Sequence, residues 1–149
     1  MNSKITLLAI VIVIAALFGL LYFSTTRSGE NEQAADTSIS YEDIGPEEFN
    51  EILGNSDPFV IDVHTPEQAH IEGTDAFIDY AIIDEQTQKL PADKDTEILV
   101  YCRSGNMSGI ASEKLIEMGY TNVRNLAGGV KAWEAAGYEL NPDLIGTFN

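Results

Sequence analysis

Two spacings of apolar residues follow one another along the chain, and they predict strands that alternate with helices. Continuous apolar runs at 58–63, 97–101 and 122–126 have the length and composition of strands buried on both faces. Parallel sheets covered by helices on both sides produce such runs. Weaker signals for short strands or turns lie at 39–41, 76–78 and 81–83.

Helical spacing appears in the segments between these runs. Apolar stripes predict helices at 46–53, ended by Gly54, and at about 108–118, ended by Gly119. A shorter helix follows the Gly128–Gly129 turn. Thr65, Pro66 and Gln68 fit a capping box and predict one more helix start. The alternation predicts an α/β fold with a central parallel sheet and helices on both faces.

The segment before this domain has a different pattern. Residues 5–23 are 19 consecutive residues without a charge, and as a helix they would rise about 28 Å, close to the thickness of a bilayer core. No small-residue cleavage pattern follows, so residues 1–23 are predicted to be one transmembrane helix that acts as an uncleaved signal anchor. Lys4 weakly favours a cytoplasmic N-terminus. The prediction is a single-pass protein of the cell membrane with an extracytoplasmic domain.

The polarity of the chain after residue 23 sets the boundaries of the linker, the domain and the tail. Residues 24–38 are polar and small, so they are predicted to be a flexible linker to the domain at 39–141. Residues 142–149 are predicted to be a C-terminal tail.

The chain has a formal net charge of −16, and 21 of its 24 acidic residues lie beyond residue 38. This excess of acid excludes nucleic acid as a partner, because phosphate backbones are bound by clustered Lys and Arg.

Cysteine and histidine are scarce. Cys102 is the only cysteine, so neither an internal disulfide nor a zinc site with several cysteines can form. His64 and His70 lack a ligand pattern around them, so no metal and no cofactor is expected. Any chemistry of Cys102 is therefore that of a thiol, a thiolate or a mixed disulfide.

The position of Cys102 favours such chemistry. It ends a predicted strand, and ligands of open α/β folds bind beyond the carboxyl ends of strands. The small residues after it allow backbone N–H groups to point inward as an anion-binding nest, and Arg103 adds a positive charge. Both features favour the nucleophilic thiolate. The competing interpretation is a small buried cysteine that ends a core strand.

Four motifs in order resemble those of the rhodanese homology family of single-domain sulfurtransferases. They are DVHTPE at 62–67, HIEG at 70–73, YCRSGN at 101–106 and LAGG at 126–129, the last followed by Trp133 and Gly137. The resemblance implies that Cys102 takes a sulfane sulfur from a small donor, thiosulfate or a persulfide, and passes it to a thiol or another nucleophilic acceptor. The residues it implies for substrate binding are Arg103, Ser104, Gly105, Asn106, Met107 and Ser108.

Two positions depart from the family pattern, and a third distinguishes this chain from related phosphatases. Met107 stands where the family loop often has Arg, and His64 replaces another Arg, so thiosulfate is expected to be a poor donor and a persulfide a better one. Ser108 stands where related phosphatases carry the Arg that clamps phosphate oxygens, which argues against phosphatase activity. The alternative function is a non-catalytic, membrane-anchored rhodanese-like module that binds a partner protein.

Overall fold

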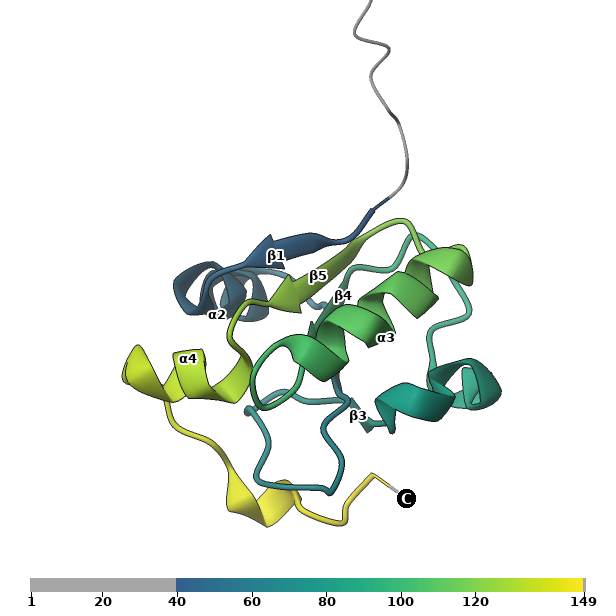
Figure 1. Cartoon of the computed structure of the whole chain (residues 1–149). Coiled ribbons are helices and arrows are strands. Elements are labelled where there is room, and N and C mark those ends of the chain that lie inside the picture. The colour runs from purple at the N-terminus through teal and green to yellow at the C-terminus, as the bar shows by residue number, and fades with distance from the viewer. Residues whose placement is uncertain (1–39, 149) are drawn as a thin grey trace, which may run out of the picture. The chain divides into compact units, whose positions relative to one another are not determined.

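A sheet of five parallel strands organises the described part of the chain. The computed structural model describes residues 40–148, and the strand order is β1-β5-β4-β2-β3 (Figure 1). Every strand pair in this sheet is parallel, as the apolar runs predict. The strands are β1 (Glu42–Ile44), β2 (Phe59–Asp62), β3 (Ala76–Phe77), β4 (Ile98–Tyr101) and β5 (Val123–Leu126).

Helices cover both faces of this sheet. The α-helices are α2 (Pro46–Asn55), α3 (Asn106–Glu117) and α4 (Gly129–Ala135), and 3₁₀ helices span Tyr80–Glu85, Thr87–Lys89 and Pro142–Leu144. Figure 1 shows α3 lying across the sheet beside the 3₁₀ segment that follows β3. Buried Leu115 of α3 packs in one hydrophobic cluster, whereas Phe49 of α2 and Trp133 of α4 pack in a second. The predicted two-sided α/β architecture is therefore confirmed.

Alternation along the central strand β4 explains how the two clusters form. Ile98 and Val100 belong to the α3 cluster, and Leu99 and Tyr101 to the cluster under α2 and α4. All four side chains are fully buried. Successive side chains of a strand point to opposite faces, so Cys102, the next residue, belongs to the α3 side.

Four local predictions differ from the structure. The first strand is Glu42–Ile44, and the described residues of 39–41 lie outside it. This edge strand pairs on one side only, and its exposed Glu and Asp give no apolar pattern. The segment 81–83, predicted as a short strand or a turn, is part of a 3₁₀ helix. Gly54 lies inside α2, which ends one residue later, and α3 begins at Asn106 instead of 108.

The helix predicted from the capping box at Thr65 is absent from the structure, in which residues 64–69 form bends and irregular chain. The segment offers no apolar stripe that a helix could bury against the sheet. Its polar residues turn inward instead: the Glu67 carboxylate accepts a hydrogen bond from the His70 ring at 3.0 Å and from the Gly146 N–H at 2.8 Å. The segment therefore carries the sequence pattern of a helix N-cap but forms no helix.

The fully buried His70 side chain joins this segment to β2 and to the end of the chain. Its Nδ1 lies 2.9 Å from the Asp62 carboxylate, and Phe148 packs edge-on against its ring. Burial by itself would lower the pKa of His70, but the hydrogen bonds and charges of Asp62 and Glu67 outweigh it and raise that pKa. The backbone N–H of Gly146 lowers the pKa of Glu67, against the effect of burial.

The predicted membrane helix at 1–23 and the linker at 24–38 lie outside the described residues. Among residues 40–148, every helix is too short or too polar to cross a bilayer.

Candidate active site

Cys102 directly follows β4, at the carboxyl edge of the sheet where the sequence predicts a ligand site. Only 1% of the residue is exposed. Its neighbour across the sheet is the end of β2, because Val63 donates its N–H to the Tyr101 carbonyl at 2.9 Å. The cysteine therefore lies between the body of the sheet and the start of α3.

Two hydrogen-bond donors converge on the sulfur. The Gly105 backbone N–H lies 3.1 Å from Sγ, and the hydroxyl of Ser108 lies 3.3 Å from it. Ser108 is fully buried, and its hydroxyl also lies 3.2 Å from the Gly105 carbonyl. Gly105 has a φ of +90°, a conformation that lets the loop turn back toward Sγ and that favours glycine. Such donors stabilise a negatively charged sulfur more than a neutral one.

Several backbone N–H groups of the cysteine loop and the first turn of α3 have no acceptor within the part of the chain that the structure describes. Within residues 40–148, this holds for the backbone N–H groups of Arg103, Ser104, Asn106 and Met107. The last two belong to the first turn of α3, whose N–H groups have no partner inside the helix. Unpaired N–H groups at a helix start form a site for an anion. The loop can therefore hold negative charge beyond the sulfur itself.

The turn between β5 and α4 holds the cysteine loop in place. The carbonyl of Cys102 accepts from the Val130 N–H at 2.9 Å, and that of Arg103 accepts from the Lys131 N–H at 3.2 Å. A Cβ atom on Gly129 would lie 2.2 Å from the Cys102 carbonyl oxygen, so only glycine fits at this contact. The sequence predicts only a turn at this Gly-Gly pair. Its contact with the loop depends on tertiary structure.

The predicted substrate-binding residues are brought together, but in two different local structures. Arg103, Ser104 and Gly105 form the loop, and the side chains of the first two are exposed. Asn106 and Met107 begin α3, where Asn106 is exposed and Met107 packs half-buried against the cluster that contains Cys102.

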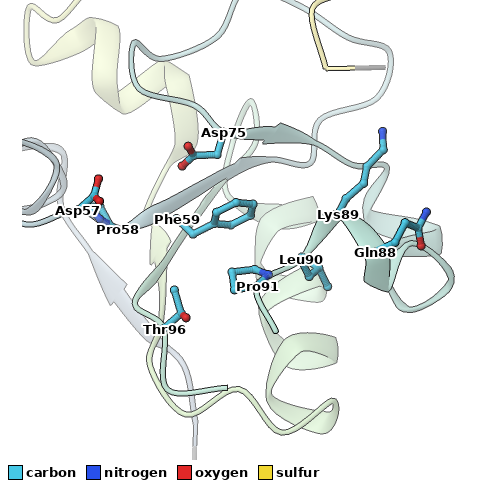
Figure 2. A pocket seen from close by; sticks show the side chains of 9 residues that line it. All are labelled: Asp57, Pro58, Phe59, Asp75, Gln88, Lys89, Leu90, Pro91 and Thr96. Carbon is cyan, nitrogen blue, oxygen red and sulfur yellow. The ribbon is translucent and has the colours of Figure 1, made fainter. Parts of the chain in front are cut away.

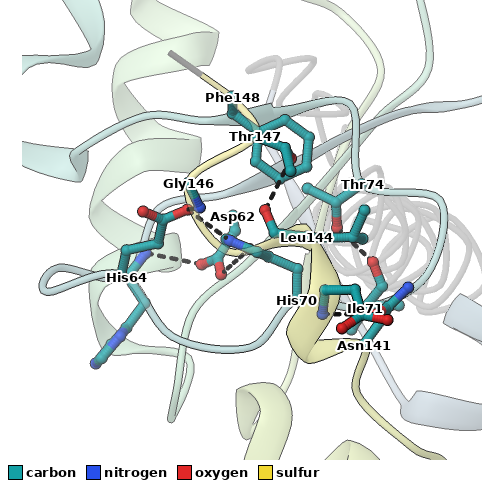
Figure 3. Close-up of polar contacts among 12 residues, drawn as sticks. Asp62, His64, His70, Ile71, Thr74, Asn141, Leu144, Gly146, Thr147 and Phe148 are labelled. Carbon is teal, nitrogen blue, oxygen red and sulfur yellow. Dashed lines mark hydrogen bonds and ion pairs between the residues drawn. The ribbon is translucent and has the colours of Figure 1, made fainter.

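His64 follows β2 at the same edge of the sheet. Its backbone N–H donates to the Asp62 carboxylate at 2.8 Å, and Figure 3 shows its ring directed away from the Asp62–His70 pair. It is 8% exposed, and Nδ1 has no hydrogen-bond partner within the described chain. Among residues 40–148, no cluster of three His, Cys, Asp or Glu side chains could hold a metal ion.

A separate groove opens at the opposite edge of the sheet (Figure 2). Phe59 at the start of β2 and Thr96 just before β4 line it, together with Asp57 and Lys89. Strands in a parallel sheet all run the same way, so this groove lies at their amino ends and Cys102 at their carboxyl ends. The groove is therefore not part of the cysteine site.

The fold and the site define one class of protein, a parallel α/β domain with a cysteine loop at the carboxyl end of its central strand. Residues 45–136 match the rhodanese-like domain. The chain belongs to the rhodanese family.

Several named proteins of this kind are similar to the chain. It is 42% identical over 73 residues to the thiosulfate sulfurtransferase PspE of Escherichia coli, covering 48% of this chain and 69% of PspE. It is 37% identical over 99 residues to the adenylyltransferase and sulfurtransferase UBA4 of Candida albicans, covering 60% of this chain but only 23% of UBA4. A rhodanese-related protein of Thermoplasma volcanium superposes with a TM-score of 0.58 at 25% identity, covering 67% of this chain and 97% of that one.

Proposed function

We propose that this chain is a sulfurtransferase that carries a sulfane sulfur on Cys102. The observation that carries the proposal is the pair of hydrogen bonds to Sγ, from the Gly105 N–H at 3.1 Å and the Ser108 hydroxyl at 3.3 Å. A buried structural cysteine needs no such donors. The sulfurtransferase names of the relatives support the same reaction class.

Loading begins with the Cys102 thiolate, which attacks the outer sulfur of the donor. A new S–S bond forms with the electron pair of the thiolate, and the donor's own S–S bond breaks. Its electron pair leaves with sulfite when the donor is thiosulfate, or with a thiolate when the donor is a persulfide. The N–H groups of Arg103, Ser104, Asn106 and Met107, which have no acceptor in the described chain, support this step because they can donate to the charged terminal sulfur.

Unloading reverses the roles. The terminal sulfur first takes the proton of the acceptor thiol through solvent. The acceptor thiolate then attacks this outer sulfur, and the Cys102 thiolate leaves with the electron pair of the broken bond. The acceptor becomes a persulfide, and the Cys102 thiolate returns. No external oxidant or reductant is needed, because each S–S bond formed replaces one that is broken.

A persulfide is the proposed donor class, with thiosulfate a poor substrate. Met107 occupies the first turn of α3 with an apolar side chain packed against the cluster around Cys102, where it offers no charge to a dianion. Arg103 is the one cation in the loop itself, and the domain is otherwise strongly acidic. Thiosulfate carries two negative charges, and the apolar side chain of Met107 offers no partner to the second, whereas a persulfide carries only one.

A turnover assay tests the proposal. Purified protein is supplied with a small persulfide donor and a thiol acceptor, and formation of the acceptor persulfide is followed against the matched variant Cys102→Ser. The expected result is turnover in the wild type and only the uncatalysed rate in the variant. Equal rates in both proteins would contradict sulfur transfer through Cys102 and favour the binding-module alternative.

The proposed location is the cell membrane, with the domain outside the cytoplasm. This part of the proposal rests on the uncharged run at 5–23 and the weak charge bias of Lys4. Labelling of Cys102 in intact cells with a membrane-impermeant thiol reagent tests it, after urea has opened the buried site. Labelling without permeabilisation is expected. Protection until the membrane is permeabilised would contradict the orientation.

A further inference from the structure

The basic side chains of this acidic domain differ in whether they contact other groups of the protein. Residues 40–148 contain six of them, and four are engaged by other groups. The engaged ones are Lys89 on the Phe148 carbonyl, Lys94 over the Tyr120 ring, Lys114 on Asp84, and Arg124 on Glu42 and Glu97. Arg103 and Lys131 have neither an ion pair nor a ring contact within the described chain. These two cations are therefore available to a ligand.

The two residues that carry these cations meet at the cysteine loop. The Lys131 N–H donates to the Arg103 carbonyl at 3.2 Å, so the two residues are direct neighbours although 28 positions separate them. Both side chains are exposed. The pair is called the Arg103–Lys131 entrance below.

Acidic residues are absent from the segments that build this entrance. None of the 21 acids beyond residue 38 falls within 98–112, which holds β4 and the cysteine loop, or within 118–133, which holds β5 and the start of α4. Glu134 is the next acid along α4, and it makes no ion pair with Lys131 in the described structure. The segments that build the entrance thus carry two unpaired cations and no acid, in a domain that is otherwise strongly acidic.

The electrostatic field of these two cations and of the acidic domain around them acts on any charged molecule that approaches Cys102. Oppositely charged molecules are steered toward a local patch, and like charges are excluded. On the basis of the proposed sulfur transfer, we propose that the Arg103–Lys131 entrance selects an acceptor thiol that carries a negative charge, and that Lys131 is a specificity-determining residue. In the unloading step, the acceptor's anionic group lies near these cations while its thiolate attacks the outer persulfide sulfur.

The test isolates the unloading step. Cys102 is first loaded with sulfur and the loading is measured by intact mass. Three acceptors of different charge are then added separately: mercaptopropionate, mercaptoethanol and cysteamine, which are anionic, neutral and cationic. The second-order rate of persulfide discharge is compared between wild type, Lys131→Glu and the matched control Lys94→Glu. The control has the same change in net charge, in the loop before β4 at the opposite edge of the sheet. Ratios of variant to wild type remove the different intrinsic reactivities of the thiols.

The expected ratios follow the charge of the acceptor. Reversing one charge at roughly 8 Å in water changes the rate about fivefold at low salt. Lys131→Glu is therefore expected to slow the anionic acceptor by about fivefold, speed the cationic one by a similar factor, and leave the neutral one within about twofold. Lys94→Glu is expected to change all three ratios little.

Two results would overturn the inference. One is the same ratio for all three acceptors in Lys131→Glu. The other is an equal charge dependence in Lys94→Glu, which would assign the effect to net charge alone. If no donor loads Cys102, the proposed function fails at the loading measurement and this inference fails with it, so the two failures are distinguishable.

Discussion

Gly129→Ala tests whether the cysteine loop depends on its contact with the β5–α4 turn. The added Cβ would lie 2.2 Å from the Cys102 carbonyl oxygen and 2.6 Å from backbone atoms of Arg103 and Ser104. These atoms belong to the main chain and cannot rotate away, so the loop itself must move. The φ of +59° adds the strain of a side chain in the left-handed region. The loop supplies the Gly105 N–H that binds the sulfur, so a shift should impair loading as well as stability.

The loss of stability expected for Gly129→Ala has two contributions, backbone strain and overlap of the added Cβ with neighbouring atoms. A left-handed conformation costs an alanine about 1–2 kcal/mol, and overpacking adds about 1–3 kcal/mol. The free energy of unfolding should therefore fall by about 2–5 kcal/mol in Gly129→Ala. Gly119→Ala is the matched control: its φ is +92°, but nothing lies within 4 Å of the added Cβ. It should lose only the strain energy, about 1–2 kcal/mol.

Urea unfolding measures both free energies, and intact mass after a short exposure to donor measures persulfide formation per folded molecule. Gly129→Ala is expected to lose more stability than Gly119→Ala and to load at least tenfold more slowly than wild type, the loss expected when one hydrogen bond to the charged sulfur is broken. Gly119→Ala should load at the wild-type rate. Normal loading by folded Gly129→Ala would refute the claim that this contact positions the loop.

Three further predictions concern groups near the site and the buried histidine. Ser108→Ala removes the 3.3 Å hydrogen bond to the sulfur and should slow persulfide formation about tenfold, whereas Ser112→Ala removes a buried hydroxyl without a partner and should not. Equal rates in the two variants would count against the role of the hydroxyl. Met107→Arg should raise thiosulfate turnover by adding a cation to the first turn of α3; no gain would show that charge at this position is not limiting. The raised pKa of His70 and the lowered pKa of Glu67 predict that their joint contribution to stability is fully present between pH 4.5 and 6.5, their ordinary values. It should be lost as the pH rises through the folded-state pKa of His70 or falls through that of Glu67. Thermal unfolding of His70→Gln should be less pH-dependent than wild type at both ends, and an identical profile would exclude this contribution.

The strands that the sequence predicted well are those buried on both faces. β2, β4 and β5 are short apolar runs, and helices cover both of their faces, so their composition reports their position directly. The edge strand Glu42–Ile44 gave no such signal, since it pairs only with β5 and exposes its acids. The capping box at Thr65 failed for a different reason: a cap predicts where a helix begins only if an apolar face follows.

Within the candidate site, too, the sequence predicts only the residues whose signal is local. Cys102 and its loop could be found because the small residues after a buried strand are local in sequence. The contact of Gly129 with the loop and the proximity of Lys131 to Arg103 could not, because they depend on how the β5–α4 turn packs against a loop more than 20 residues earlier. The inward turn of His70 and Glu67 was missed too, since it depends on Gly146 and Phe148 at the end of the chain.

The central claim is that Cys102 carries a transferable sulfur. Mass spectrometry of the purified protein after treatment with a persulfide donor measures this directly. The expected result is a gain equal to one sulfur atom, located on the peptide that contains Cys102, absent from Cys102→Ser and removed by an added thiol. No gain with any sulfane donor, or a gain that thiols do not remove, would contradict it.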